Sequence, residues 1–305
     1  MTKTHMEDYQ EKPIKSGVIS LIGPPNVGKS TLLNCLLGQK ISIVSPKPQT
    51  TRNRIPGILN GPGYQIVILD TPGIHKANSP LNLEMVKIAL GSLSEVDVIV
   101  FMIDVTFPLP EKIPDAASYL EKAGRPVILL INKVDLIPKE RLLPIFKAYE
   151  KLYPFQAMIP ISALHGDGAD ILLETLLPLL PSGPPLYPID IPTDATERFI
   201  VAEMIREKIF LLTSQEIPYS TAVTVDRFKE NEAANRITIH ATIFIERKSQ
   251  KGILIGKGGS MLKKIGIRAR KDIEKLLGAK VNLKLWVKVQ KEWTRDMRFL
   301  KELGF

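Results

Sequence analysis

Eight consecutive residues near the start of the chain have the types and spacing that bind phosphate. The run GPPNVGKS fits the pattern G-x-x-x-x-G-K-[ST], and it lies between an apolar run at 17–22 and a helix-like stretch at 29–37. Its glycines let backbone N–H groups point at phosphate oxygens, while Lys29 can neutralise them and Ser30 can bind Mg²⁺. The expected phosphate-binding residues are Gly23, Pro24, Pro25, Asn26, Val27, Gly28, Lys29, Ser30 and Thr31.

A second motif, DTPG at 70–73, follows an apolar run at 65–69. An acid at a strand end, 40 residues after Ser30, suits a Mg²⁺ contact, direct or through water. Gly73 can offer its backbone N–H to a terminal phosphate. By itself this tetrapeptide is a common turn, so it indicates a nucleotide site only in combination with the phosphate-binding motif.

Two further motifs can read a guanine base. The tetrapeptide NKVD at 132–135 ends an apolar run, and the Asp135 carboxylate can accept hydrogen bonds from guanine N1–H and the exocyclic amino group. Adenine lacks this donor pair, so the motif selects GTP over ATP. The tripeptide SAL at 162–164 ends the next apolar run, and its backbone N–H can donate to guanine O6. The expected guanine-binding residues are Asn132, Lys133, Asp135, Ser162, Ala163 and Leu164.

The elements that must position these motifs alternate in type. Strand-like apolar runs fall at 17–22, 65–69, 97–103, 126–131 and 157–161, and helix-like stretches at 29–37, 83–93, 112–122, 140–151 and 169–180. This alternation predicts an α/β domain, a mostly parallel sheet with helices on both faces. In such sheets ligands bind at the carboxyl ends of the strands, where all four motifs lie.

The order of the motifs resembles the Ras-like P-loop GTPases over residues 15–180. In that family a threonine between the loop and the acid closes on Mg²⁺ and the γ-phosphate, and here the interval holds Thr50 and Thr51. We favour Thr51 because it precedes Arg52. The resemblance implies GTP or GDP as the ligand, with Mg²⁺ held by Ser30, Thr51 and Asp70.

Position 74 departs from many members of that family. They carry a glutamine that orients the attacking water, whereas this chain has Ile74, which cannot form a hydrogen bond through its side chain. The chain resembles the subgroup with a hydrophobic residue at this position. In some of its members the loop asparagine, here Asn26, coordinates K⁺; a local turn-capping role for Asn26 is an equal alternative.

The net positive charge of the chain comes entirely from residues 191–305. Residues 1–190 hold 18 basic and 18 acidic side chains, whereas residues 191–305 hold 23 and 14, a net +9. A neutral part joined to a basic part suggests a module for an anionic partner, nucleic acid or anionic membrane. The segment 181–194, with five prolines, is the predicted linker between a domain at 15–180 and one at 195–305, and residues 1–14 are the predicted tail.

The basic part contains a glycine turn between two helix-like stretches. The expected order is helix 195–212, strands 221–228 and 236–246, a glycine-broken helical pair at 249–277, a strand at 281–289 and a helix at 292–300. This α+β order, with the turn GKGG at 256–259, resembles the type II KH fold, which binds single-stranded RNA. The expected RNA-binding residues are Gly256, Lys257, Gly258, Gly259, Lys263, Lys264 and Arg268.

Trp286 lies between two lysines on one face of the last predicted strand. An aromatic ring between Lys284 and Lys288 can stack a base. Packing under the last helix, at 292–300, is the interpretation we favour for this side chain.

Composition limits the cell compartment and the class of protein. With 44 % hydrophobic and 24 % charged residues, the chain is typical of globular proteins. The single cysteine, Cys35, cannot form an internal disulfide and fits a reducing cytosol. No apolar run reaches the ~18 residues of a membrane span, and the N-terminal 15 residues lack an apolar signal core.

Together the two halves resemble the Era family of bacterial GTPases from about residue 15 to residue 305. The resemblance implies a cytoplasmic GTPase that binds the 3′ end of 16S ribosomal RNA, not DNA, and assists 30S subunit assembly, with peripheral association with the inner membrane. Two other functions stay open. One is a GTPase whose basic domain reads anionic lipid, and the other is an RNA-binding module with a non-hydrolysing nucleotide site.

Overall fold

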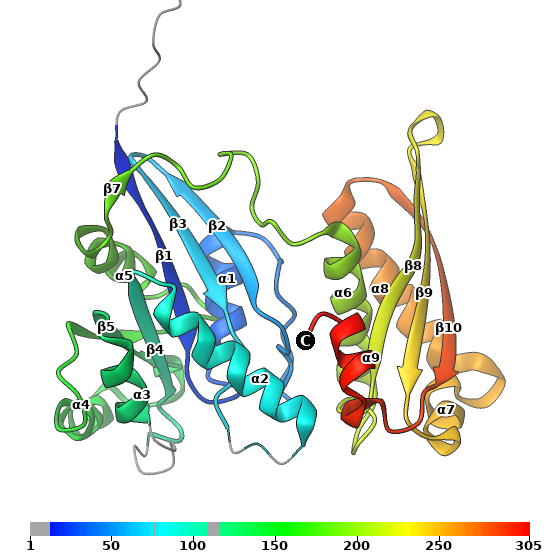
Figure 1. The fold of residues 1–305 in the computed structure, drawn as a ribbon, viewed down its shortest axis with the longest axis horizontal. Coiled ribbons are helices and arrows are strands. Elements are labelled where there is room, and N and C mark those ends of the chain that lie inside the picture. Colours follow the sequence, from blue (N-terminus) through cyan, green and yellow to red (C-terminus); the bar gives the residue numbers. More distant parts are fainter. Residues whose placement is uncertain (1–12, 76, 78, 109–115) are drawn as a thin grey trace, which may run out of the picture.

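The protein is seen here in a computed structural model that describes residues 13–75, 77, 79–108 and 116–305. Two sheets with their own helices lie side by side (Figure 1). The first sheet contains β1 Ile14–Ile22, β2 Ile55–Gly61, β3 Tyr64–Asp70, β4 Val98–Asp104, β5 Val127–Asn132, β6 Ala157–Ile161 and β7 Ser182–Gly183. The main order is β2-β3-β1-β4-β5-β6; β2 runs antiparallel to β3, β7 pairs antiparallel with β1, and the other neighbours are parallel.

Helices cover both faces of this sheet. They are α1 Lys29–Leu37, α2 Pro80–Gly91, α3 Ala116–Ala123, α4 Leu142–Glu150 and α5 Ala169–Leu176. One apolar core joins the sheet to α1 and α5 through Leu32 and Leu172. A second core joins the opposite face to α2 through Ala89 and to α4 through Ile145. The predicted α/β class is therefore confirmed.

Strand β2 was not expected from the sequence. Pro56, Gly57 and Gly61 give this segment a poor strand composition, since proline and glycine are depleted in strands. It forms because its position is at the edge of the sheet, where it pairs antiparallel with β3. Gly57 lets α1 pack closely there, because a Cβ atom would lie 2.5 Å from Leu33 Cδ1 and that side chain would have to move.

The second domain has a three-stranded sheet packed against helices. Its strands are β8 Ala222–Asn231, β9 Arg236–Ile245 and β10 Lys280–Val289, in the order β10-β9-β8. Its helices are α6 Glu197–Leu212, α7 Lys248–Ile255, α8 Ser260–Leu277 and α9 Met297–Glu302. Helices α6, α7 and α8 lie on one face of the sheet, and α9 lies against Phe244 at one end of the other. Strands β9 and β10 are parallel, whereas β8 and β9 are antiparallel. Together with the helix order, this confirms the predicted type II KH architecture.

The expected packing of Trp286 is wrong. Its side chain is 47 % exposed, because the alternation along β10 places it on the sheet face opposite to α6 and α8. The tryptophan that packs under the last helix is Trp293, which is fully buried, lies against Phe299 and donates from Nε1 to the Ser220 carbonyl at 2.8 Å.

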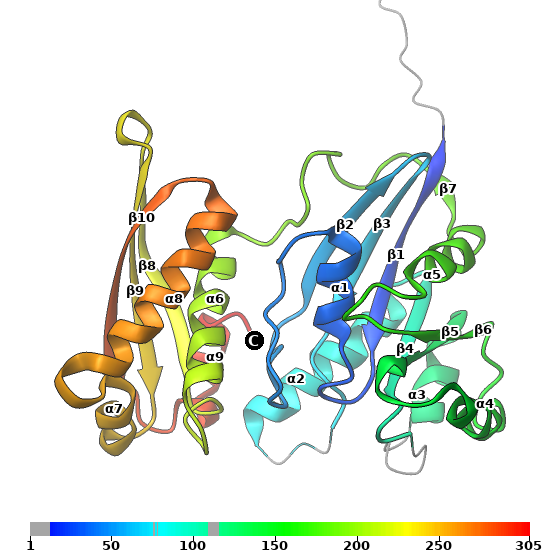
Figure 2. The same cartoon turned by 180° about the vertical axis from the view of Figure 1, so that it is seen from behind.

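Helices α6 and α8 lie between the second sheet and the first domain, as the front and back views agree (Figures 1 and 2). The buried Arg52 crosses this boundary and donates to the carbonyls of Pro218, Tyr219 and Thr221 at 2.8–3.2 Å. Its guanidinium also lies 5.7 Å from the centre of a Trp293 ring. The two domains are therefore joined by polar contacts from the segment that precedes β2.

The proline-rich segment lies along the first sheet. β7 pairs with β1, and the Ile58 N–H donates to the Pro192 carbonyl at 2.8 Å. The limits 1–14, 15–180, 181–194 and 195–305 stay a prediction, and residues 1–12 of the tail lie outside the described residues. Among the helices that are described, none has the length and apolar character needed to cross a membrane.

Candidate nucleotide site and RNA-binding turn

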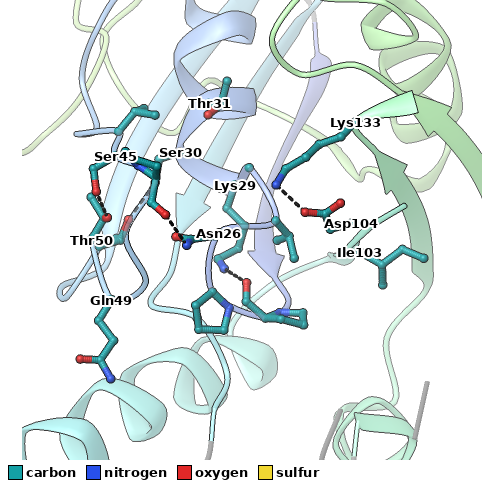
Figure 3. Close-up of a pocket in the computed structure, with 18 of the residues that line it drawn as sticks. Asn26, Lys29, Ser30, Thr31, Ser45, Gln49, Thr50, Ile103, Asp104 and Lys133 are labelled. Atoms are coloured by element: carbon teal, nitrogen blue, oxygen red, sulfur yellow. Dashed lines mark hydrogen bonds and ion pairs between the residues drawn. The ribbon is translucent and has the colours of Figure 1, made fainter. Parts of the chain in front are cut away.

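A cavity of about 620 Å³ opens at the carboxyl ends of the strands of the first sheet. Its lining contains residues 24–31 of the predicted phosphate loop, most of the segment 43–51, Gly73 and Lys133 (Figure 3). It also contains residues that the sequence motifs do not include, among them Asp104, Thr106 and Phe107. They follow β4, so the strand-end rule that located the motifs could also have located them.

The phosphate loop fits between neighbouring strands only because of its glycines. A Cβ atom on Gly23 would lie 2.2 Å from the Met102 carbonyl oxygen, and one on Gly28 would lie 2.3 Å from Asn132 Nδ2. Both glycines also have a positive φ, 147° and 103°, which favours residues without a side chain. The loop is therefore fixed against the ends of β4 and β5.

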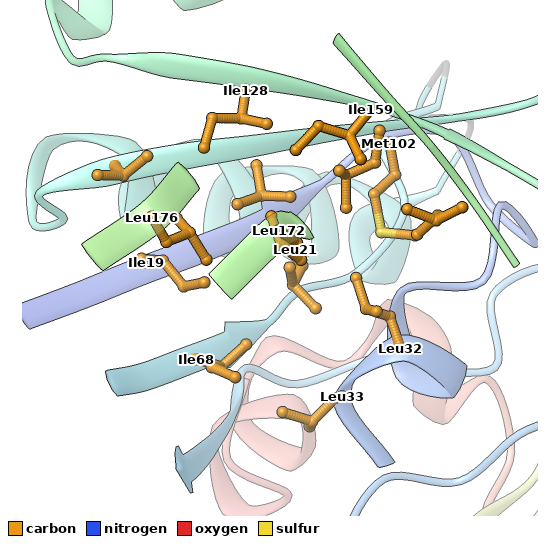
Figure 4. Close-up of a cluster of buried hydrophobic side chains, with 14 of the residues drawn as sticks. Ile19, Leu21, Leu32, Leu33, Ile68, Met102, Ile128, Ile159, Leu172 and Leu176 are labelled. Atoms are coloured by element: carbon orange, nitrogen blue, oxygen red, sulfur yellow. The ribbon is translucent and has the colours of Figure 1, made fainter. Parts of the chain in front are cut away.

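The helix that follows the loop is anchored in the core beneath it. Leu32 and Leu33 of α1 are buried and belong to the same core as Ile19 and Ile68 of the central strands (Figure 4). This packing holds the first turn of α1, and hence the side chain of Lys29, at the mouth of the cavity.

Lys29 is buried and turned back on its own loop. Its Nζ donates to the carbonyls of Gly23 and Pro24 at 3.1 and 3.0 Å. Burial lowers the pKa of Lys29 to about 8, although the nearby carboxylate of Asp70 acts in the opposite direction. A buried cation with neutral partners is ready to receive an anion.

Three side-chain hydroxyls gather around Asp70. Ser30 Oγ donates to Asp70 Oδ2 at 2.6 Å and lies 2.8 Å from Thr51 Oγ1, while Ser42 Oγ also donates to Oδ2 at 2.6 Å. Thr50 instead donates to the Lys47 carbonyl. Burial raises the pKa of Asp70, and the hydroxyl donors oppose this rise.

The second oxygen of Asp70 is buried and has no hydrogen-bond partner among the described residues. Oxygen donors are the ligands that Mg²⁺ prefers, so this unpartnered oxygen and the hydroxyls of Ser30 and Thr51 fit a divalent cation.

The predicted guanine-reading residues lie together and support one another. Asn132 Nδ2 donates to the Val27 carbonyl at 2.6 Å, and its Oδ1 accepts from the Ala163 N–H at 2.9 Å. Ser162 Oγ donates to Asp135 Oδ1 at 2.6 Å, which leaves the other carboxylate oxygen for a base.

Lys133 and Leu164 complete the rim of this site. Lys133 has a left-handed backbone, with φ 67°, and its ammonium pairs with Asp104, whose other oxygen accepts from the N–H of Thr106. Leu164 is 72 % exposed. Hydrogen bonds thus hold Asn132 to Ala163 and Ser162 to Asp135, and of the six predicted guanine-site residues it is Lys133 that lines the cavity.

The segment after Gly73 packs closely on the phosphate loop. A Cβ atom on Gly73 would lie 2.6 Å from the Pro25 backbone nitrogen, and the Ile74 N–H donates to the Gly23 carbonyl at 3.0 Å. The Ile74 side chain is 6 % exposed and belongs to the second core. It therefore points away from any attacking water.

The glycine turn of the second domain is open by comparison. It follows α7 and precedes α8, and Gly256, Gly258 and Gly259 all have a positive φ, from 59° to 80°. A Cβ atom on Gly258 or Gly259 would meet nothing within 4 Å. The cations expected to bind RNA are exposed and form no ion pair within the described chain; they are Lys257, Lys263, Lys264 and Arg268.

The comparisons with known proteins divide the chain in the same way. A family model described as "50S ribosome-binding GTPase" matches residues 18–133, and one described as "KH domain" matches residues 216–294. The GTPase Era of Geotalea uraniireducens is 56 % identical over 97 % of this chain and 99 % of its own length. That of Geobacter metallireducens is 55 % identical over the same shares.

Two solved structures are also similar over nearly the whole length. A variant of Aquifex aeolicus Era bound to GDP and AlF₄⁻ has a TM-score of 0.92 and 44 % identity, covering 95 % of this chain and 99 % of the other. A structure of Era in complex with MgGDPNP and nucleotides 1506–1542 of 16S ribosomal RNA has the same TM-score, identity and coverage.

The fold and the strand-end motifs thus define a P-loop GTPase joined to a KH domain. More narrowly, the near full-length similarity shows that the chain belongs to the GTPase Era family. Its enzymatic activity is the hydrolysis of GTP to GDP and phosphate.

Proposed function

We propose that this protein binds the 3′ end of 16S ribosomal RNA through its KH domain and uses GTP binding and hydrolysis to assist assembly of the 30S subunit. The proposal rests on one observation. The chain in which Ser162 holds Asp135, the predicted base reader, also presents in a second domain an exposed glycine turn with cations that form no ion pair within the described residues. A similar protein of known structure was solved with a segment of this RNA.

In the nucleotide site we assign a role to each group around Asp70. Ser30 and Thr51 hold Mg²⁺ directly through their hydroxyls, and Asp70 holds it directly or through water. Thr51 is preferred to Thr50 because only Thr51 lies beside Ser30. Bound Mg²⁺ neutralises charge on the β- and γ-phosphate oxygens.

The other residues position the nucleotide and stabilise the transition state. Lys29 and the N–H groups of 23–31 stabilise the charge that spreads over the γ-phosphate during in-line attack by water. Gly73 donates its N–H to the same phosphate. Asp135 binds the two donors of guanine, with Ser162 holding the carboxylate in place.

We further propose that Asn26 holds a K⁺ ion beside the phosphates. Its Nδ2 donates to the Pro46 carbonyl at 2.8 Å, and its backbone has a positive φ of 64°. The amide oxygen has no partner within the described residues and suits a monovalent cation. Because Ile74 cannot orient water, a cation in this position would stabilise the transition state instead.

The K⁺ proposal predicts that GTP turnover is several-fold faster in K⁺ than in Na⁺ or choline. Rates are measured in the three salts for the wild type and for Asn26→Ala, which should lose the dependence. Equal wild-type rates in all three salts would rule out the K⁺ site.

The ribosomal role is tested in cells depleted of the protein. Depletion should reduce mature 30S subunits and leave unprocessed 16S RNA, and the wild-type gene should restore both. The variant Lys257→Asp/Gly258→Asp should fail to restore them although it still binds GTP. Full rescue by this variant would contradict the role of the turn.

We place the protein in the cytoplasm and, through its exposed cations, in peripheral contact with the inner membrane. Fractionation of cells at low and high salt tests both points. A membrane-bound fraction that high salt releases would support electrostatic contact; a fully soluble pool at low salt would contradict it.

A further inference from the structure

One face of the second sheet is open over most of its length. The opposite face is covered, since Ile239 and Ile243 of β9 share a core with Leu254 of α7 and Ile265 of α8. Helices α6 and α8 lie between the sheet and the first domain (Figures 1 and 2), and α9 covers only the end of the open face at Ala222 and Phe244. The glycine turn belongs to the helical layer and not to this open face.

The open face is strongly basic. Cross-strand pairing places Lys284 beside His240, and His240 beside Arg227, so that their side chains share this face. The exposed cations of the three strands on this face are Arg227, Lys229, Arg236, Lys280, Lys284 and Lys288. Within the described chain none of them forms an ion pair, so their charge is available to a partner.

The only carboxylate of the three strands that shares this face, within the described residues, is already occupied. Asp226 accepts from Thr224 Oγ1 at 2.9 Å and from Thr242 Oγ1 at 2.6 Å. It is therefore fixed within the sheet and is not directed at the cations.

An aromatic pair lies among the cations. The rings of His240 and Trp286 are 5.0 Å apart, with 64° between their planes, and Trp286 keeps 47 % of its surface exposed. Lys284 and Lys288 flank it along the strand. A flat ring between two cations can stack an unpaired base while the cations bind the neighbouring phosphates.

We propose that this open face is a second RNA-binding surface, on which Trp286 and His240 stack bases and Lys284 and Lys288 bind phosphates. The surface takes single-stranded RNA beyond the few nucleotides held at the glycine turn. The polar residues between the cations, Thr238 and Asn282, offer hydrogen bonds to bases and riboses. A lipid surface would instead require exposed aliphatic side chains on this face.

The inference rests on the proposed RNA-binding function, and its test separates the two. The long probe is the RNA corresponding to nucleotides 1506–1542 of 16S ribosomal RNA. The short probe is its last six nucleotides, close to the four that a KH turn clamps. Affinity is measured by fluorescence anisotropy over a salt series with the full-length protein.

Trp286→Ala should weaken binding of the long RNA about tenfold, as expected for loss of one stacked base. Lys284→Glu/Lys288→Glu should weaken it further and reduce the salt slope by about 1.4, which corresponds to two phosphate contacts. Neither variant should change binding of the short RNA. Trp286→Phe should restore most of the lost affinity, because phenylalanine keeps a ring for stacking.

Two controls support this reading. Lys147→Glu/Lys151→Glu reverses two exposed charges on the first domain and should leave both affinities unchanged. Lys257→Asp/Gly258→Asp should weaken both RNAs. Trp286 fluorescence should be quenched by the long RNA, and this quenching should be absent in Trp286→Phe.

Three results would overturn the proposal. If the open-face variants bind the long RNA like the wild type while the turn variant does not, this surface is not used and the proposed function stands. If the wild type binds neither RNA, the proposed function itself fails. If the open-face variants lose binding only to phosphatidylglycerol vesicles, the partner of this surface is a membrane.

Discussion

The nucleotide site and the glycine turn are built in opposite ways. In the nucleotide site Lys29 and Asp70 are buried, and most functional side chains are already bonded to another group: Lys29 to its own loop, Ser30 to Asp70, and Ser162 to the exposed Asp135. At the turn, Gly258 borders open space and Lys257 is exposed.

This difference indicates how each region selects its ligand. A side chain positioned to hydrogen-bond a ligand is left unpaired by an analogue that lacks the matching group, so the nucleotide site discriminates sharply between similar bases. Exposed cations make phosphate contacts that add roughly independently and that salt weakens. Because these cations stay hydrated in the free protein, each contact adds affinity for RNA with little desolvation cost and little selectivity. Single changes should therefore have larger and more specific effects in the nucleotide site.

The largest expected effect follows from changing the base reader. Asp135→Asn should reduce the preference for GTP over xanthosine triphosphate by about 10³-fold or more, because an amide presents a donor to the guanine amino group. Xanthine has an oxygen at that position and accepts the donor. Competition binding with the two nucleotides measures the change.

Ser162→Ala is the matched control for this change, since it removes only the support of the carboxylate. It should weaken GTP binding several-fold without changing which base is preferred. An Asp135→Asn variant that binds GTP like the wild type and still rejects xanthosine triphosphate would show that the carboxylate does not read the base.

The next effect concerns the open region. Lys257→Asp/Gly258→Asp should weaken single-stranded RNA binding about 10²-fold at low salt, since two carboxylates would face phosphates in the turn. Gly258 has a φ of 59°, so a side chain there also adds local strain. Anisotropy measures RNA affinity, and GDP binding by the same preparation should remain unchanged because the nucleotide site lies in the other domain.

Much of the nucleotide site could be predicted from the sequence because its motifs are local. The phosphate loop, DTPG, NKVD and SAL each follow a strand, and the topology brings strand ends together. Asp104 ends β4, so the strand-end rule places it near the site, but a single acid without a motif does not indicate a role. Its role as the partner of Lys133 depends on two neighbouring strands and appears only in three dimensions.

The features that could not be predicted depend on contacts between distant segments. Strand β2 has a poor strand composition and is stabilised by pairing with β3. Trp286 and Trp293 both lie near the last helix in sequence, but only Trp293 is buried. Trp286 is exposed because it points to the open face of β10, and Trp293 is buried because α9 begins only at Met297, after it, and packs over it. The sequence marks Arg52 only as the residue after Thr51, whereas in the structure its side chain joins the two domains.

The domains that carry the two regions are joined by the contact made by Arg52, which gives a third prediction. Arg52→Ala should lower the free energy of unfolding by about 2 kcal/mol, because it leaves buried carbonyls without donors. The control is Arg54→Ala, which removes an exposed pair with Glu95 and should cost less than about 0.5 kcal/mol. Urea unfolding measures both, and equal costs would show that the buried contact adds nothing.

The smallest expected effect is a pH dependence of nucleotide binding that RNA binding at the turn should not share. The pKa of Lys29 is lowered from 10.5 to about 8 in the free protein, so above pH 8 this side chain loses the charge that phosphate requires. Bound nucleotide favours the protonated form, and affinity for GDP should therefore fall up to about tenfold per pH unit above pH 8. Between pH 8 and pH 10.5 Lys29 is mostly protonated in the unfolded chain and mostly neutral in the folded protein. Because the unfolded state binds the proton more tightly, the free energy of unfolding of the free protein should rise with pH in this range.

Calorimetric titration of GDP between about pH 7 and pH 9 tests this, and Lys29→Met is the matched control. Guanine itself begins to lose its N1 proton at the upper end of this range, and the control retains that effect while lacking the lysine. The wild type should lose affinity more steeply than Lys29→Met and should take up a proton on binding, seen as a dependence of the heat on the buffer. RNA binding at the turn should change little over the same range, because its exposed lysines stay charged. Parallel pH profiles for the wild type and Lys29→Met would mean that burial does not tune this lysine, and that the closed and open regions differ in geometry alone.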